Sequence, residues 1–166
     1  MATLVERMQG AAMLRVATYE EVEHDHTATG QAATVVAIAA VAQAIGSIGQ
    51  GGPGVVSALF GQLFGWAIWA GLTYLVGTRL FGGTADWGEL LRTVGFSQAP
   101  LVLAVLGFIP LLGGFIRFAL AIWVAVAGVI AVRQALDIST GKAVATVLIA
   151  ILPLLVIMAV LGSILG

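Results

Sequence analysis

Hydrophobic and polar positions follow one another along this chain in long blocks. Five apolar stretches, at residues 32–48, 55–76, 97–112, 115–136 and 143–165, are separated by short polar or glycine-rich segments. An α-helix needs about 20 mostly apolar residues to cross the hydrocarbon core of a bilayer, and inside lipid it satisfies its own backbone hydrogen bonds. The pattern therefore predicts five membrane-spanning helices.

The third apolar stretch is shorter than the others and carries a proline near each end, Pro100 and Pro110. Proline removes a backbone donor and kinks a helix unless neighbouring groups compensate. We therefore expect a broken or tilted third span. Residues 84–96 precede it and predict a short amphipathic helix, for which Thr84 or Asp86 is the candidate cap.

The N-terminal thirty residues are more polar than the rest. Within residues 2–16 the side chains of Leu4, Val5, Met8 and Ala12 fall on roughly one helical face. Two interpretations stay open, a helix lying on the membrane surface and a partly ordered tail. We assign residues 1–30 to an N-terminal amphipathic and acidic segment and residues 31–166 to a membrane domain.

Composition supports the same fold class. Hydrophobic residues make up 60% of the chain and charged residues 9%, whereas a soluble domain carries about 25% charge. We expect an all-α, polytopic membrane bundle whose main surroundings are the lipid bilayer. The net charge of −1 without a basic patch argues against a nucleic-acid partner.

The residues needed for catalysis are missing from the predicted spans. The chain has no cysteine, both histidines precede the first span, and no span contains an acidic residue. A proton relay or an intramembrane hydrolase needs such groups inside the bundle. We therefore expect no enzymatic activity and no cofactor.

Basic residues are distributed unequally between the two ends of the predicted spans. Arg117 falls near one end, and the other six fall near the opposite end: Arg7, Arg15, Arg79, Arg92, Arg133 and Lys142. Cytoplasmic loops are enriched in Lys and Arg. The distribution predicts a cytoplasmic N-terminus, an external C-terminus and three charged segments that all face the cytoplasm.

These three charged segments are the candidate surface for another membrane or peripheral protein. The candidate partner-binding residues are Glu20, Glu23, Asp25, Gln31, Asp86, Glu89, Arg92, Arg133, Asp137 and Lys142. Glu20, Glu23 and His24 would also share one helical face, which makes them weak candidates for a divalent metal. The alternative is that they are solvated residues at a helix start.

A second set of residues is compatible with transport. It consists of amides, prolines and one arginine in or beside the spans: Gln43, Gln62, Gln98, Pro100, Pro110 and Arg117. Polar groups and helix breaks within a bilayer mark transport paths in many membrane proteins. Arg117 lies close to a Gly-Gly turn, however, so an arginine extending to the outer membrane surface explains it as well. The Gly61-xxx-Gly65 spacing favours close helix packing and permits a homo-oligomer.

Two segments resemble the Yip1 domain as found in prokaryotic members of that family. One is Glu-Glu-Val-Glu-His-Asp-His-Thr-Ala-Thr-Gly-Gln-Ala at 20–32, and the other is Arg-Gln-Ala-Leu-Asp-Ile-Ser-Thr-Gly-Lys-Ala at 133–143. The resemblance implies five spans, a cytoplasmic N-terminus and residence in a prokaryotic plasma membrane. Eukaryotic members are multi-spanning proteins of the early secretory pathway implicated in Rab-type GTPase binding, vesicle traffic and membrane shaping. This chain departs from them because it lacks their long tail with its Tyr-Gly-Pro type motif.

The sequence thus yields two functional hypotheses. The first is a non-enzymatic membrane scaffold or organiser that binds a partner through its cytoplasmic face. The second is a small transporter or channel with a proline-broken third span.

Overall fold

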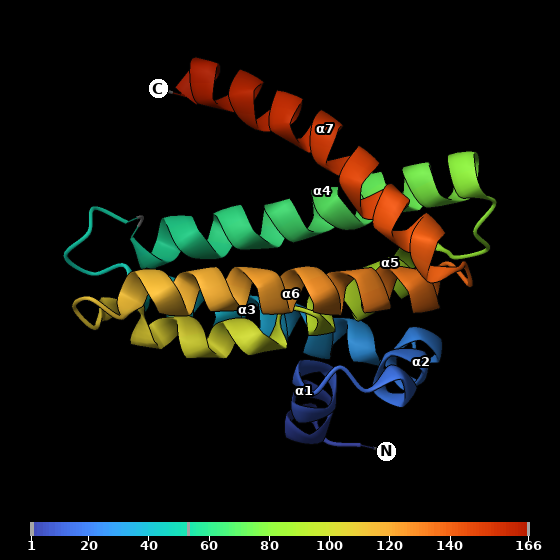
Figure 1. The fold of residues 1–166 in the computed structure, drawn as a ribbon, viewed down its shortest axis with the longest axis horizontal. Coiled ribbons are helices and arrows are strands. Elements are labelled where there is room, and N and C mark those ends of the chain that lie inside the picture. Colours follow the sequence, from blue (N-terminus) through green and yellow to red (C-terminus); the bar gives the residue numbers. More distant parts are fainter. Residues whose placement is uncertain (1, 53, 166) are drawn as a thin grey trace.

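The computed structural model describes residues 2–52 and 54–165, and these residues form helices and no strand. The α-helices are α1 (Leu4–Ala12), α2 (Val16–His24), α3 (Ala28–Gly46), α4 (Val55–Phe81), α5 (Trp87–Phe96), α6 (Gly113–Ala135) and α7 (Thr140–Leu165). A 3₁₀ helix, η1 (Ala99–Phe108), follows α5. The predicted all-α fold is confirmed (Figure 1).

Four helices, α3, α4, α6 and α7, are long and apolar enough to cross a membrane. α5 and η1, which are bent by 41° at a short break, count as a fifth candidate if the pair makes one span. The structure therefore contains four to five candidate spans, as the apolar pattern predicts. α7 also contains an internal proline, Pro153.

The third span is built differently from its prediction. The prediction began it at residue 97, whereas the candidate span in the structure includes α5. Glu89 and Arg92 lower the hydropathy of α5, so the apolar pattern did not include it. Pro100 lies in the first turn of η1, where a missing N–H is tolerated, and Pro110 lies beyond its end. A break is present, but it falls between Phe96 and Ala99, ahead of both prolines, so the prolines predicted to cause it do not lie at it.

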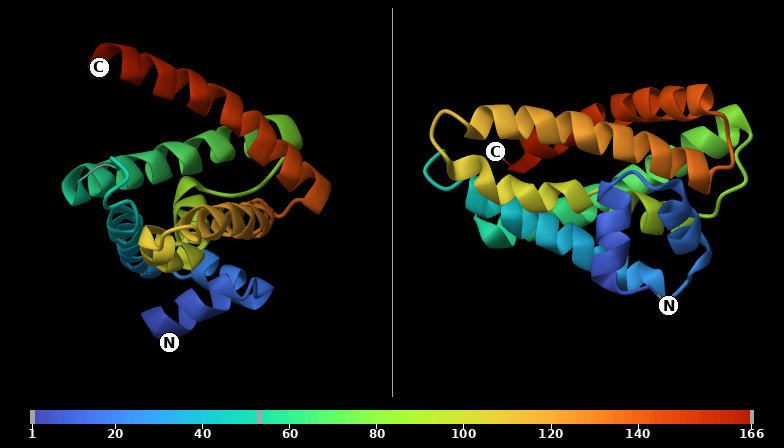
Figure 2. Two further views of the ribbon diagram at one scale, coloured as in Figure 1. Left: turned by 60° about the vertical axis from the view of Figure 1, so that its left-hand side comes forward. Right: turned by 60° about the horizontal axis from the view of Figure 1, so that its bottom comes forward.

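The N-terminal segment forms two helices, so the alternative of a partly ordered tail is wrong. A capping box begins α1: the Glu6 backbone N–H donates to Thr3 Oγ1, and the Glu6 carboxylate accepts from the Thr3 backbone. Leu14 adopts a left-handed backbone conformation, φ 59°, and separates α1 from α2. In Figure 1 and the right panel of Figure 2, α1 runs across the direction of α6.

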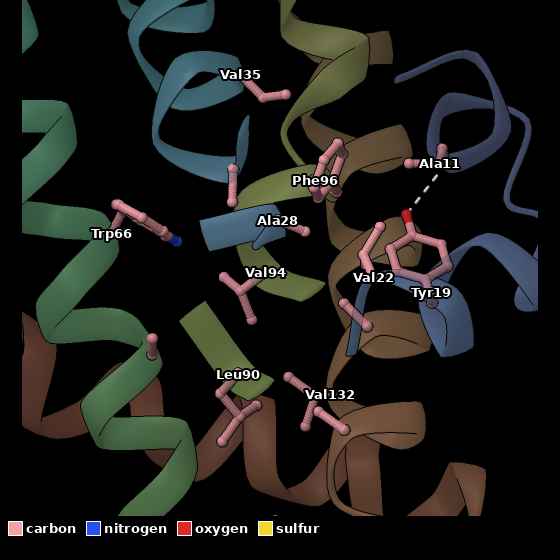
Figure 3. Packing of buried hydrophobic residues seen from close by; sticks show 14 of the residues in the cluster. Ala11, Tyr19, Val22, Ala28, Val35, Trp66, Leu90, Val94, Phe96 and Val132 are labelled. Atoms are coloured by element: carbon pink, nitrogen blue, oxygen red, sulfur yellow. Dashed lines mark hydrogen bonds between the residues drawn. The ribbon is translucent and has the colours of Figure 1, made fainter. Parts of the chain in front are cut away.

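One hydrophobic core joins these N-terminal helices to the spans. Tyr19 and Val22 of α2 are fully buried beside Phe96 of α5 and Val132 of α6 (Figure 3). The Tyr19 hydroxyl donates to the carbonyl oxygen of Ala11 at 3.0 Å, which closes α2 onto α1. The segment before the first span is thus part of the same folded unit.

The C-terminal helix packs on the bundle only in part. α7 contacts α4 and α6, but its C-terminal part runs away from both in Figure 1 and the left panel of Figure 2. Its side chains Leu152, Leu155 and Val156 are exposed. Such a surface fits the apolar interior of a bilayer.

The tightest crossing in the bundle lies between α3 and η1. A Cβ added to Gly46 would stand 1.9 Å from the backbone oxygen of Ala104. The glycine at this position thus allows the two backbones to meet. The Gly61-xxx-Gly65 motif does not serve this purpose within the described residues, because a Cβ at either glycine would meet nothing within 4 Å.

We expect Gly46→Ala to lower the free energy of unfolding by about 1–3 kcal/mol, because a backbone oxygen cannot move aside as a side chain can. The matched control is Gly128→Ala in α6, where an added Cβ has open space and alanine favours the helix. Thermal unfolding in detergent measures both variants. Equal melting temperatures for Gly46→Ala and the parent chain would contradict the close crossing.

Candidate functional site at the polar end of the bundle

The bundle has two chemically different ends. The polar end consists of α1, α2, the start of α5 and the turn between α6 and α7, and it holds all eight Asp and Glu residues. The apolar end consists of the α3–α4 loop and the turn between η1 and α6, and Arg117 is the charged residue nearest to it.

Arg92 of α5 fixes the position of α2. Its side chain is 3% exposed, and its Nε donates to the carbonyl oxygens of Val22 and Glu23, both at 3.0 Å. These carbonyls belong to the last turn of α2, which has no helical donors left for them. A cation is also favoured there by the helix dipole. Arg92 therefore holds the C-terminus of α2 against the third span.

A second buried arginine, Arg7, connects the N-terminal helices to the first span. It is 3% exposed and lies 2.9 Å from the carboxylate of Glu21 and 2.6 Å from that of Asp25. Its Nη1 donates to the side-chain oxygen of Gln31 at 2.9 Å. Hydrogen bonds from the Thr27 side chain and then from Arg7 lower the pKa of Asp25 to about 2.

Helices that carry carboxylates pack together at this end, where α2 contacts α5 and α6. Burial is the main cause that raises the pKa of Glu23 to about 7, although the nearby His24 imidazole lowers it. Asp137, Glu89 and Glu20 raise it further by repulsion between negative charges. We call these four residues, Glu20, Glu23, Glu89 and Asp137, the acidic cluster.

Other polar-end residues form contacts within the chain. Gln134 Nε2 donates to Glu20 at 2.9 Å, and Arg133 Nε donates to Gln134 at 2.8 Å. Lys142 Nζ donates to the carbonyl oxygen of Phe81, the last residue of α4, at 3.2 Å. These bonds join the end of α6 to α2 and the start of α7 to the end of α4.

Asp86 and Glu89 form a capping box at the start of α5, as the sequence predicts for Asp86. The Glu89 backbone N–H donates to Asp86 at 2.8 Å, and the Asp86 N–H donates to Glu89 at 2.7 Å. Asp86 therefore stabilises the N-terminus of α5. Glu89 belongs both to this capping box and to the acidic cluster.

The three weak metal candidates do not assemble into a metal site. Across the described residues, no group of three or more His, Cys, Asp or Glu could hold an ion. The His24 ring nitrogen Nδ1 lies 2.8 Å from the carbonyl oxygen of Glu20, one turn earlier in α2. His24 thus interacts with its own helix.

Three of the six predicted transport residues line a cavity of about 720 Å³ towards the apolar end. Gln43, Gln62 and Arg117 line it. Gln98 lies beside it, because its side-chain oxygen accepts from Gln62 at 2.6 Å. Neither Pro100 nor Pro110 lines the cavity.

Arg117 lies where the sequence places it, at the apolar end of α6, and it is exposed. Its Nη2 donates to the carbonyl oxygens of Gly46 at 3.2 Å and Gly107 at 3.1 Å. It also donates to the side chain of Gln50, a residue that sequence reasoning missed. Gly46 ends α3 and Gly107 lies in the last turn of η1, so this cation too serves helix C-termini.

A family model of the Yip1 domain matches residues 15–163, which is nearly the whole chain. The chain belongs to the Yip1 family. Searches of curated proteins and of solved structures gave no significant match. The matched residues of this chain include α2 and all four residues of the acidic cluster as well as most of the candidate spans.

Replacing Arg92 tests whether its hydrogen bonds to Val22 and Glu23 hold α2 against α5. We call these bonds the Arg92 clamp. We expect Arg92→Gln to lower the free energy of unfolding by about 2–3 kcal/mol, because charged hydrogen bonds are lost and two buried carbonyls remain unpaired. Arg92→Lys should recover only part of this, since an ammonium lacks the guanidinium fork. Thermal or denaturant unfolding in detergent measures the loss.

The matched control is Arg15→Gln, which removes an exposed cation from the α1–α2 linker. A loss for Arg15→Gln as large as that for Arg92→Gln would show that charge alone, rather than the clamp, stabilises the fold.

The raised pKa of Glu23 predicts that the stability of the fold depends on pH. This pKa is about 7 in the folded chain and 4.5 ordinarily, so the folded state binds more protons between these values. The unfolding free energy therefore decreases as pH rises from 4.5 to 7. Glu23→Gln should remove this decrease and be more stable than the parent at pH 8 by on the order of 2 kcal/mol.

The control for this experiment is Asp86→Asn, because asparagine caps a helix as well as aspartate does. Melting temperatures of the three chains between pH 4.5 and 8 decide the question. A parent chain with the same slope as Glu23→Gln would rule out the raised pKa.

Proposed function

We propose that this Yip1-family protein is a non-enzymatic membrane scaffold that binds a partner through its polar end, and that this end faces the cytoplasm. The observation that carries the proposal is the acidic cluster, which α2, α5 and the α6–α7 turn assemble from distant parts of the chain. Such a surface exists only in the folded bundle, as expected of a specific docking site.

The basic residues of the polar end support this proposal through their contacts. Arg7 is paired with Glu21 and Asp25, and Arg92 and Lys142 donate to helix C-termini. Among the described residues, none of these cations forms a salt bridge with a carboxylate of the acidic cluster. The cluster therefore retains negative charge that a basic partner surface can complement, which favours fast and selective association.

The proposed orientation of the bundle in the membrane is based on the distribution of basic residues. Six of the seven Lys and Arg residues belong to the polar end or the helix ends beside it, namely Arg7, Arg15, Arg79, Arg92, Arg133 and Lys142. By the positive-inside rule this end is cytoplasmic.

The helix α1 adds a lipid contact to the scaffold. The indole Nε1 of Trp123, in the middle of α6, donates to the carbonyl oxygen of Ala12 at 2.8 Å. Val5 and Met13 are exposed at 61% and 65%, although both are apolar. We therefore infer that the C-terminal end of α1 packs beside the middle of α6 and that these exposed apolar side chains contact lipid.

Crosslinking in native membranes, followed by identification of the crosslinked proteins, tests the proposal. The test variant is Glu20→Lys with Asp137→Lys, which reverses two charges of the acidic cluster. The matched control, Gln9→Lys, adds a positive charge on the exposed side of α1. We expect the double variant to lose its partner about tenfold or more while the control keeps it. Equal recovery from both variants, or recovery of this chain alone, would contradict the scaffold.

A small transporter or channel is the second candidate, favoured by the cavity that collects Gln43, Gln62 and Arg117. The lining residues lie in the halves of the helices next to the apolar end. Towards the polar end the space between the helices is filled by the buried core, including Trp66, Leu90 and Val94. Transport would require this core to open, and ion or solute flux into liposomes containing the purified chain would reveal it.

A further inference from the structure

The cavity at the apolar end has the shape of a groove between two spans. α3 and η1 form its floor with Ala40, Ala44 and Ala104. α4 and α6 form its walls, and within the described residues these two helices pack on α3 and η1 rather than closely on each other. Among the α7 side chains that the structure describes, none lines the groove, and α7 diverges from α4 and α6 on this side (Figure 1). The groove therefore opens sideways, towards the lipid.

The surroundings of the groove place it inside the membrane. Large apolar side chains project outwards beside it: Leu111 is fully exposed, and Phe115 and Phe118 are 70% and 66% exposed. This end of the bundle is stable only where those side chains contact lipid. The volume of about 720 Å³ lies within the usual range for ligand pockets, roughly 300–1,000 Å³.

Arg117 supplies one positive charge at the edge of this groove, and no acidic residue lies near it to balance the charge. All eight carboxylates belong to the polar end. All of the hydrogen bonds that Arg117 makes to described residues come from Nη2, and every acceptor is a neutral oxygen. Nε and Nη1 thus remain available to a negatively charged oxygen.

We infer that the groove binds one anionic phospholipid, with its phosphate at Arg117 and an acyl chain along the groove. A guanidinium is well suited to pair with a phosphate, because its planar donors match the phosphate oxygens. The walls are mainly apolar, as an acyl chain requires. Ser57, Gln62 and Gln43 add a few polar groups that can contact the glycerol region.

This site lies at the opposite end from the acidic cluster, so it does not depend on the proposed scaffold function. It also gives a role to Gly61, which the bundle does not use for helix packing. Gly61 lines the groove, and a Cβ there would meet nothing within 4 Å. A side chain at position 61 would enter the space that we assign to the lipid.

Native mass spectrometry of the purified chain tests the inference, with dioleoylphosphatidylglycerol as the probe and dioleoylphosphatidylcholine as the neutral comparison. We expect one phosphatidylglycerol to remain bound to the parent chain after detergent washing, in preference to phosphatidylcholine. Arg117→Gln should reduce its retention about tenfold, the usual effect of losing a charged hydrogen bond.

Gly61→Leu provides an independent variant that keeps Arg117 and its helix-capping bonds. It should also abolish retention, because leucine fills the groove. Gly65→Leu is the matched control: it lies one turn along α4 and has equally open space, but it does not line the groove. Arg79→Gln controls for loss of a positive charge elsewhere on α4. Both controls should retain the lipid as the parent does.

Three results would overturn the inference. One is equal retention in the parent, Arg117→Gln and Gly61→Leu, which would place the lipid elsewhere. Another is a parent chain that holds no phosphatidylglycerol above the phosphatidylcholine level, as expected if α7 or a second copy of the chain fills the groove. The third is full displacement of the lipid by inorganic phosphate, which would show that the acyl chain contributes nothing.

Discussion

The arrangement of this protein depends on one buried guanidinium. Arg92 is placed in a helix that begins the third span, yet it donates to the last carbonyls of a helix that precedes the first span. Burying a charge costs free energy unless hydrogen bonds compensate, and the open C-terminal turn of α2 offers acceptors with a favourable dipole. Once α2 is held there, Tyr19 and Val22 become part of the core, and its acidic side chains face those of α5 and the α6–α7 turn.

The same device recurs at other helix ends. Lys142 donates to the end of α4, and Arg117 donates to the ends of α3 and η1. In a bilayer the last carbonyls of a span have few other donors when they lie away from the water. A chain with only seven basic residues thus uses three of them to close helix C-termini. This separates the two ends chemically: negative charge accumulates at the polar end, and one positive charge stands alone near the apolar end.

Most of the membrane architecture was predictable, because a span must be apolar along its whole length. The starts of α4, α6 and α7 agree with the predicted starts within three residues. Two features were not predictable in this way. The third span begins in α5 although Glu89 and Arg92 interrupt its hydropathy, since Arg92 is satisfied by a distant helix. α2 is helical and buried although it reads as a polar tail, because Tyr19 and Val22 find partners 70 or more residues away.

The candidate sites, too, could be predicted only in part, because they depend on contacts between distant residues. The sequence indicated that the charged segments share one end of the bundle, but not which residues approach one another. The acidic cluster joins Glu20 and Glu23 to Glu89 and Asp137, whereas Asp25 and Gln31 are held by Arg7 in a separate network. Likewise Gln43, Gln62 and Arg117 were identified as polar residues within the spans, while their common groove depends on where α7 leaves the bundle.

The most direct test of this account is hydrogen exchange of the parent chain in lipid nanodiscs, followed helix by helix. If Arg92 fixes α2 in the shared core, the amides of Tyr19 to Glu23 should exchange as slowly as those in the first half of α3. Fast exchange throughout α2 beside a protected α3 would show that the N-terminal helices are not part of the folded unit, and the assembled acidic surface would then not exist.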